Sequence, residues 1–64
     1  MSETFVITDQ KSPGLYLRRM STRYGLVMPV WTTDQSRAKV WRTRAGMEAF
    51  LLAHPTQPFV GRPA

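Results

Sequence analysis

The chain has 64 residues, no cysteine and a formal net charge of +5. A chain of this length has room for one small domain, taken here as residues 1–64, and the lack of cysteine excludes a disulfide framework and any cysteine-ligated metal site. Nine Lys and Arg residues against four Asp and Glu residues favour an acidic or polyanionic partner.

The start of the chain and its hydropathy bear on location. Residues 1–4 lack the basic start and the apolar run of a secretory signal, and no apolar stretch approaches the roughly 18 residues of a membrane span. A chain without thiols also fits a reducing compartment. We therefore expect a cytoplasmic protein with no membrane partner.

Two strands and a turn are predicted first. Residues 4–8 are β-branched and aromatic, as in a strand, and residues 9–14 end in a Pro-Gly pair typical of a turn. Residues 15–20 return with a period of two. This period points Tyr16 and Arg18 away from the core.

A second turn and a third strand follow. Residues 21–25 form the predicted turn, in which Gly25 can adopt a left-handed conformation. Residues 26–31 are apolar throughout, which indicates a strand. Pro29 has no N–H to give to a neighbouring strand, so we expect this strand at the edge of the sheet.

The stretch from Gln35 to His54 has two interpretations. In the first, Lys39–Arg42 is a short fourth strand and Thr43 caps a helix over residues 44–54. In the second, one helix runs from Gln35 onward. Gly46 near the middle disfavours the long helix by about 1 kcal/mol relative to Ala, so we favour the first interpretation.

These elements predict an α+β fold: a small antiparallel sheet of three to four strands with one C-terminal helix packed on one face. We expect the helix to cover the apolar side chains Phe5, Ile7, Leu15, Leu17, Met28 and Val30. The ordered core spans about 4–54 in this interpretation. The tail, residues 55–64, contains three prolines and has no periodic pattern.

Catalytic and metal-binding signatures are missing from the sequence. His54 is the only histidine, the four acidic residues are scattered without ligand spacing, and no glycine-rich phosphate loop occurs. We therefore expect a protein that is not an enzyme and that needs no metal and no cofactor.

The charge is concentrated in the middle of the chain. Between Arg18 and Arg44 there are seven bases and one acid, a balance of +6. Arginine suits phosphate, carboxylate and aromatic groups, and tyrosine beside it is common in interfaces. The predicted partner-binding residues are Tyr16, Arg18, Arg19, Arg23, Tyr24, Arg37, Lys39, Arg42 and Arg44.

One resemblance covers most of the chain to about residue 54. It rests on the succession Phe5-Val6-Ile7, Pro13-Gly14, Tyr16-Leu17, Trp31, Ala38, Trp41 and Ala49-Phe50-Leu51. This order resembles small proteins of phages and prophages, among which are the anti-CRISPR inhibitors. The resemblance implies a non-enzymatic accessory or inhibitor protein in the host cytosol, bound to a complex that handles nucleic acid.

Three functions stay open. The first is such an inhibitor, docked on an acidic protein surface or a nucleoprotein complex of the host. The second is a direct DNA- or RNA-binding module, since the order of strands also resembles the three-stranded DNA-binding domains of phage-type integrases, although Pro29 interrupts a strand. The third is a structural or assembly protein that self-associates, for example as a homodimer.

Overall fold

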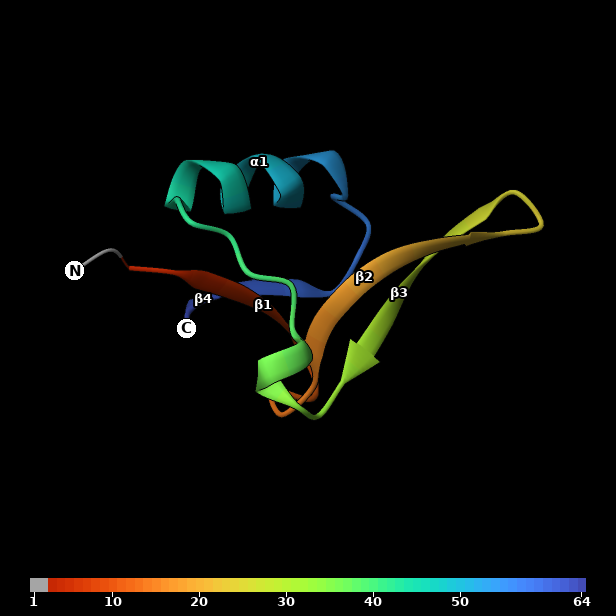
Figure 1. Ribbon diagram of the computed structural model, residues 1–64. Helices are drawn as coiled ribbons and strands as arrows, with labels where there is room; N and C mark the ends of the chain where they lie inside the picture. The colour runs from red at the N-terminus through yellow and green to blue at the C-terminus, as the bar shows by residue number, and fades with distance from the viewer. Residues whose placement is uncertain (1–2) are drawn as a thin grey trace.

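A computed structural model describes residues 3–64 of the chain (Figure 1). In chain order the elements are β1 (Phe5–Asp9), β2 (Tyr16–Arg23), β3 (Leu26–Thr32), the single-turn 3-10 helix η1 (Gln35–Arg37), α1 (Arg44–Ala53) and β4 (Phe59–Pro63). The four strands form one antiparallel sheet in the order β3-β2-β1-β4. The helix α1 lies over one face of this sheet, so the predicted α+β class is confirmed (Figure 1).

The strand β4 corrects two predictions about the end of the chain. The predicted C-terminal helix is wrong in its position, because α1 lies between β3 and β4. Within the tail, β4 pairs with the whole length of β1, from Phe5 opposite Pro63 to Asp9 opposite Phe59. Strand β4 is short, lies at the edge of the sheet and ends at Pro63. Proline is acceptable there because an edge strand has one side without a neighbouring strand that would need its N–H.

Residues 39–41 fill the gap that opens where β2 diverges from β1. Lys39 N–H donates to the carbonyl of Leu17 at 2.9 Å, and Trp41 exchanges two hydrogen bonds of 2.9 Å with Phe5. The short strand expected at Lys39–Arg42 is therefore reduced to a single bridge between Phe5 and Trp41. The first interpretation of this stretch otherwise holds, since the helix begins at Arg44.

Thr43 determines where α1 begins. Its hydroxyl accepts a hydrogen bond from Gly46 N–H at 3.0 Å, which satisfies one of the free donors of the first turn. Its extended backbone also separates α1 from η1. The helix ends at His54, whose N–H donates to the carbonyl of Leu51 at 3.1 Å.

The core lies between α1 and the facing side of the sheet. Its buried centre consists of Phe5, Ile7, Leu17 and Met47, and six partly buried side chains surround it: Met20, Trp31, Trp41, Phe50, Leu51 and Phe59. Both tryptophans belong to this shell. Trp31 meets the ring of Phe59 edge-on at 5.7 Å between centroids, and Trp41 lies 5.1 Å from Phe50.

A β-bulge at Arg18 changes which side chains face the helix. Leu17 pairs with Trp31, but Arg19 pairs with Val30, so Arg18 is the extra residue. Residues that are directly opposite in a sheet point to the same side. Trp31 lies opposite Leu17 and faces the core, so alternation along β3 places Val30 and Met28 on the face away from α1; the prediction that the helix covers these two was wrong.

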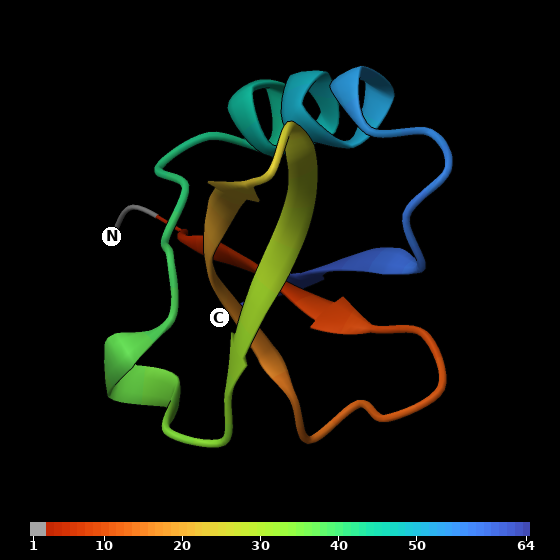
Figure 2. The same ribbon diagram turned by 90° about the vertical axis from the view of Figure 1, so that its right-hand side faces the viewer.

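The distal part of the β2–β3 hairpin extends beyond the body of the protein. We call residues 18–28 the arm; Figures 1 and 2 show it leaving the layer formed by β1, β4 and α1. It gives the molecule extents of 41 × 23 × 19 Å. The predicted turn at residues 21–25 was too long, because β2 continues to Arg23 and only Tyr24 and Gly25 connect the strands.

Candidate functional site: the β2–β3 arm

The tip of the arm is a two-residue turn with an unusual first residue. Tyr24 has φ 53° and Gly25 has φ 75°, the signs that a type I′ turn requires. Glycine adopts this conformation freely, whereas a side chain with a Cβ is disfavoured there. Tyr24 is also 96% exposed, so no packing in residues 3–64 compensates for the strain. Such strain is more common at sites of function than elsewhere.

One face of the arm combines arginine with apolar side chains. We call the side of the arm away from α1, together with Val30 next to the arm, the outer face. The strand register pairs Arg19 with Val30, Ser21 with Met28, and Arg23 with Leu26 on this face. Each pair places its two Cβ atoms about 5 Å apart. The outer face is therefore a narrow surface with two arginines along β2 and three apolar residues along β3.

The apolar residues near the tip are exposed to an unusual degree. On the outer face Leu26 is 64% exposed and Met28 is 57% exposed, while Val27 between them is exposed on the opposite side of the strand. Single exposed apolar residues are ordinary on protein surfaces, but neighbouring ones on the same face indicate a contact site. Strand β3 therefore carries an apolar patch that the fold itself does not cover.

The electrostatic character of the arm is uniformly positive. Residues 18–28 contain Arg18, Arg19 and Arg23 and no acidic residue, and all three arginines are exposed. Within the part of the chain that the structure describes, none of the three belongs to an ion pair. Their guanidinium groups are thus available to carboxylates or phosphates.

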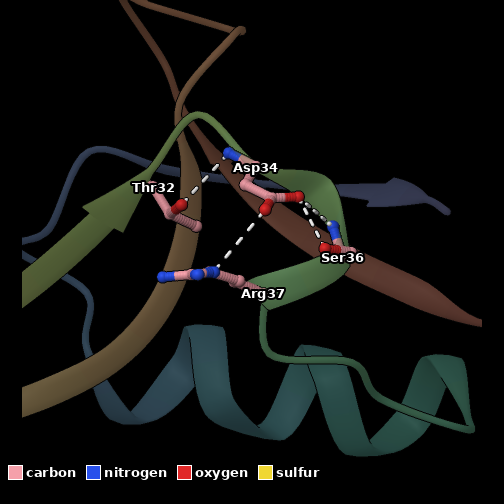
Figure 3. A network of polar contacts seen from close by, with 4 residues as sticks. All are labelled: Thr32, Asp34, Ser36 and Arg37. Atoms are coloured by element: carbon pink, nitrogen blue, oxygen red, sulfur yellow. Dashed lines mark hydrogen bonds and ion pairs between the residues drawn. The ribbon is translucent and has the colours of Figure 1, made fainter.

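The ion pair of the described residues lies elsewhere, in the loop that contains η1 (Figure 3). Arg37 Nε lies 3.6 Å from Asp34 Oδ2, and the other carboxylate oxygen accepts from Ser36 Oγ at 2.6 Å and from Ser36 N–H at 3.0 Å. Thr32 Oγ1 accepts from Asp34 N–H at 3.0 Å. The hydroxyl and the backbone N–H of Ser36 hold the pKa of the Asp34 carboxyl below its usual value.

The nine predicted partner-binding residues fall into separate groups. Arg18, Arg19, Arg23 and Tyr24 lie on the arm. Tyr16 lies at its base, half-buried and opposite Thr8 and Thr32, about 25 Å along β2 from the tip. The structure does not bring Tyr16 and Tyr24 together.

The remaining predicted residues lie at the end of η1, just after it, or around the start of α1. Arg37 is engaged by Asp34. Lys39 Nζ lies 5.5 Å from the centroid of the Trp41 ring, and Arg44 Cζ lies 5.6 Å from that of Phe5. Arg42 is exposed between them and, because it lies outside the arm, is no part of the candidate site. The cation–π contacts hold the exposed side chains of Lys39 and Arg44 against rings of the core, also outside the arm.

Sequence reasoning missed the apolar half of the outer face. Leu26, Met28 and Val30 are absent from the predicted binding residues, although they lie beside the predicted arginines. A signal for them existed in the sequence. If Tyr24-Gly25 is interpreted as a two-residue hairpin turn, Arg23 pairs with Leu26. Every second residue of a strand points to the same face, so Met28, two residues after Leu26, lies on that face as well.

Pockets and metal-binding clusters are absent from the part of the chain that the structure describes. Residues 3–64 contain no surface pocket and no cluster of three or more His, Cys, Asp or Glu side chains that could hold a metal ion. In the same range, no helix combines the length and the apolar character needed to cross a bilayer. No protein-family model, curated protein or solved structure matches the chain.

Proposed function

We propose that the protein is a non-enzymatic accessory protein that binds a nucleic-acid-handling complex of its host. The arm is the element that makes the contact, and it binds an acidic protein surface of that complex. The observation that carries this proposal is the outer face, where exposed arginines lie beside exposed apolar residues without any acid. The resemblance to small phage proteins supplies the class of partner.

The apolar residues favour a protein over nucleic acid as the direct ligand. Burying Leu26 and Met28 against a partner stabilises the complex by about 25 cal/mol for each Å² removed from water. Phosphate groups provide no apolar surface of this kind, so a backbone contact leaves both side chains in water. Aromatic and Arg side chains are also enriched where protein interfaces carry most of their binding energy.

Direct binding to duplex DNA is the second candidate, because of the shape of the arm. A two-stranded β-ribbon fits the major groove, and the arm is such a ribbon with arginine along one strand. In this alternative, affinity depends steeply on salt. Three phosphate contacts would lower it about 40-fold between about 50 and 200 mM salt.

Titration into labelled duplex and single-stranded DNA at these two salt concentrations separates the candidates. We expect weak binding to both DNA forms at either concentration. The partner is then captured on protein immobilised through its C-terminus, which lies at the end away from the arm (Figure 1). Tight, steeply salt-dependent DNA binding would replace the proposal with the second candidate.

The captured and purified partner is tested against two variants of equal charge. Arg19→Ser with Arg23→Ser removes two bases from the outer face, and Lys11→Ser with Arg42→Ser removes two exposed bases elsewhere. Exposed substitutions usually change stability by less than about 0.5 kcal/mol, so both variants fold. We expect only the arm variant to weaken binding, by at least about tenfold. Equal weakening by both variants would contradict the proposal.

A further inference from the structure

The outer face has a spacing that specifies its ligand. Arg19 and Arg23 are four residues apart on one strand and point to the same side, so their Cα atoms are separated by about 13 Å. On the neighbouring strand, Met28 lies opposite Ser21, midway between the two arginines, and Leu26 lies opposite Arg23. An apolar strip thus runs alongside the two arginines.

Resting on the proposed function, we infer that the outer face binds an extended acidic segment of the partner protein, in which two carboxylates at positions i and i+4 flank an apolar side chain at i+2. The three side chains of such a segment point to one side and span the same 13 Å or so. Each carboxylate can accept a bidentate pair of hydrogen bonds from one arginine. The apolar side chain lies against Met28 and Leu26.

The free edge of β3 does not serve as the binding site. Next to a two-residue turn the pair Arg23–Leu26 is hydrogen-bonded, and the pairs then alternate, so Pro29 opposite Met20 directs its nitrogen outward. Proline has no N–H to donate there. A strand that adds to this edge therefore loses a hydrogen bond at the middle of β3, whereas the outer face stays accessible.

A second copy of the chain does not fit the outer face. In a two-fold dimer the same patch meets itself, so the two arginines of each chain would be brought into one small interface. The arm carries no acidic residue to separate them. Like charges brought together in this way oppose association. The occupant is therefore a different chain with acidic groups.

The test uses a blocked peptide of sequence Thr-Glu-Thr-Leu-Thr-Glu-Thr and the whole protein labelled with ¹⁵N. We expect the amide signals of residues 19–28 to shift, with a Kd of about 1 mM. Replacing Leu by Gln, or both Glu by Gln, in the peptide raises Kd about tenfold, as does the Arg19→Ser, Arg23→Ser variant. The Lys11→Ser, Arg42→Ser variant binds like the unaltered protein.

Several outcomes would overturn the inference. The first two are amide signals that do not shift at about 5 mM peptide and signals that shift mainly at the start of α1. The others are equal affinity for the original and the Leu→Gln peptide, and higher affinity for duplex DNA or for vesicles of phosphatidylglycerol than for the peptide. The result is separable from the proposed function. If the peptide binds as expected but no nucleic-acid-handling partner does, the proposed function alone fails; if the partner binds through the arm but the peptide does not, this inference alone fails.

Discussion

Met47 of α1 lies directly over Gly61 of β4. A Cβ atom on Gly61 would overlap Sδ and Cε of Met47 and would lie 3.4 Å from Cδ1 of Leu51. The helix approaches the sheet this closely because the strand has no side chain at that point. Met47 is the buried residue of α1, so the position of the whole helix depends on this contact.

Gly61→Ala is expected to destabilise the protein by about 1 kcal/mol, the low end for an overfilled core, because the added methyl group displaces only the flexible end of the Met47 side chain. Urea unfolding measures the change. Gly14→Ala is the matched control, since a Cβ there meets nothing within 4 Å. That variant should be neutral or more stable by up to about 1 kcal/mol. Equal stability of the two variants would contradict the close approach of α1 to β4.

Tyr24→Asn is expected to stabilise the hairpin by about 1 kcal/mol, because Asn tolerates the left-handed conformation of a type I′ turn better than Tyr. Thermal unfolding detects this change. The same variant should weaken binding to the captured partner, since it removes an exposed aromatic ring. A gain in stability without any loss of affinity would show that Tyr24 is not part of the contact.

The titration of Asp34 can be followed by NMR of its carboxyl carbon. Its lowered pKa means that the folded protein stabilises the ionised form, so this contribution is present above the unfolded pKa and is lost as pH falls through the folded value. Ser36→Ala removes the hydroxyl that donates at 2.6 Å, and should move the pKa back toward the ordinary value. An unchanged pKa in this variant would assign the shift to another group.

Pro29→Thr is expected to increase self-association at least about tenfold, because it restores an outward N–H on the free edge of β3. Light scattering at rising protein concentration measures the subunit count. The Arg19→Ser, Arg23→Ser variant provides the comparison, since it changes the outer face and leaves the edge closed. If Pro29→Thr stays as monomeric as the unaltered chain, proline is not what protects the edge.

The sequence is enough to predict the elements that depend on local chemistry. Thr43 identifies the start of α1 and Pro29 identifies an edge strand, since each acts through its own backbone or side chain. Strand β4 could not be predicted in this way. Its residues have no periodic pattern, and they form a strand because the edge of β1 is free to pair with them. Tertiary pairing outweighs weak local preference there.

The charged residues of the candidate site were predicted from the sequence, but the apolar residues beside them were missed because the strand register was not known. Arg19 and Arg23 were found from their type alone. Their alignment on one face with Met28 follows from the two-residue turn, and the bulge at Arg18 lets Arg19 point away from α1 although Leu17 faces the core. A shift of one residue reverses every side chain of a strand, so a count of charges cannot reveal the face.

Site-specific photo-crosslinking tests the role of the arm most directly. A benzophenone amino acid replaces Tyr24 at the tip in one protein and Leu52, 80% exposed on α1, in another, and each is irradiated with the purified partner. We expect crosslinks from position 24 that disappear in the Arg19→Ser, Arg23→Ser variant, and few from position 52. Equal crosslinking from the two positions, or crosslinks from position 52 alone, would contradict it.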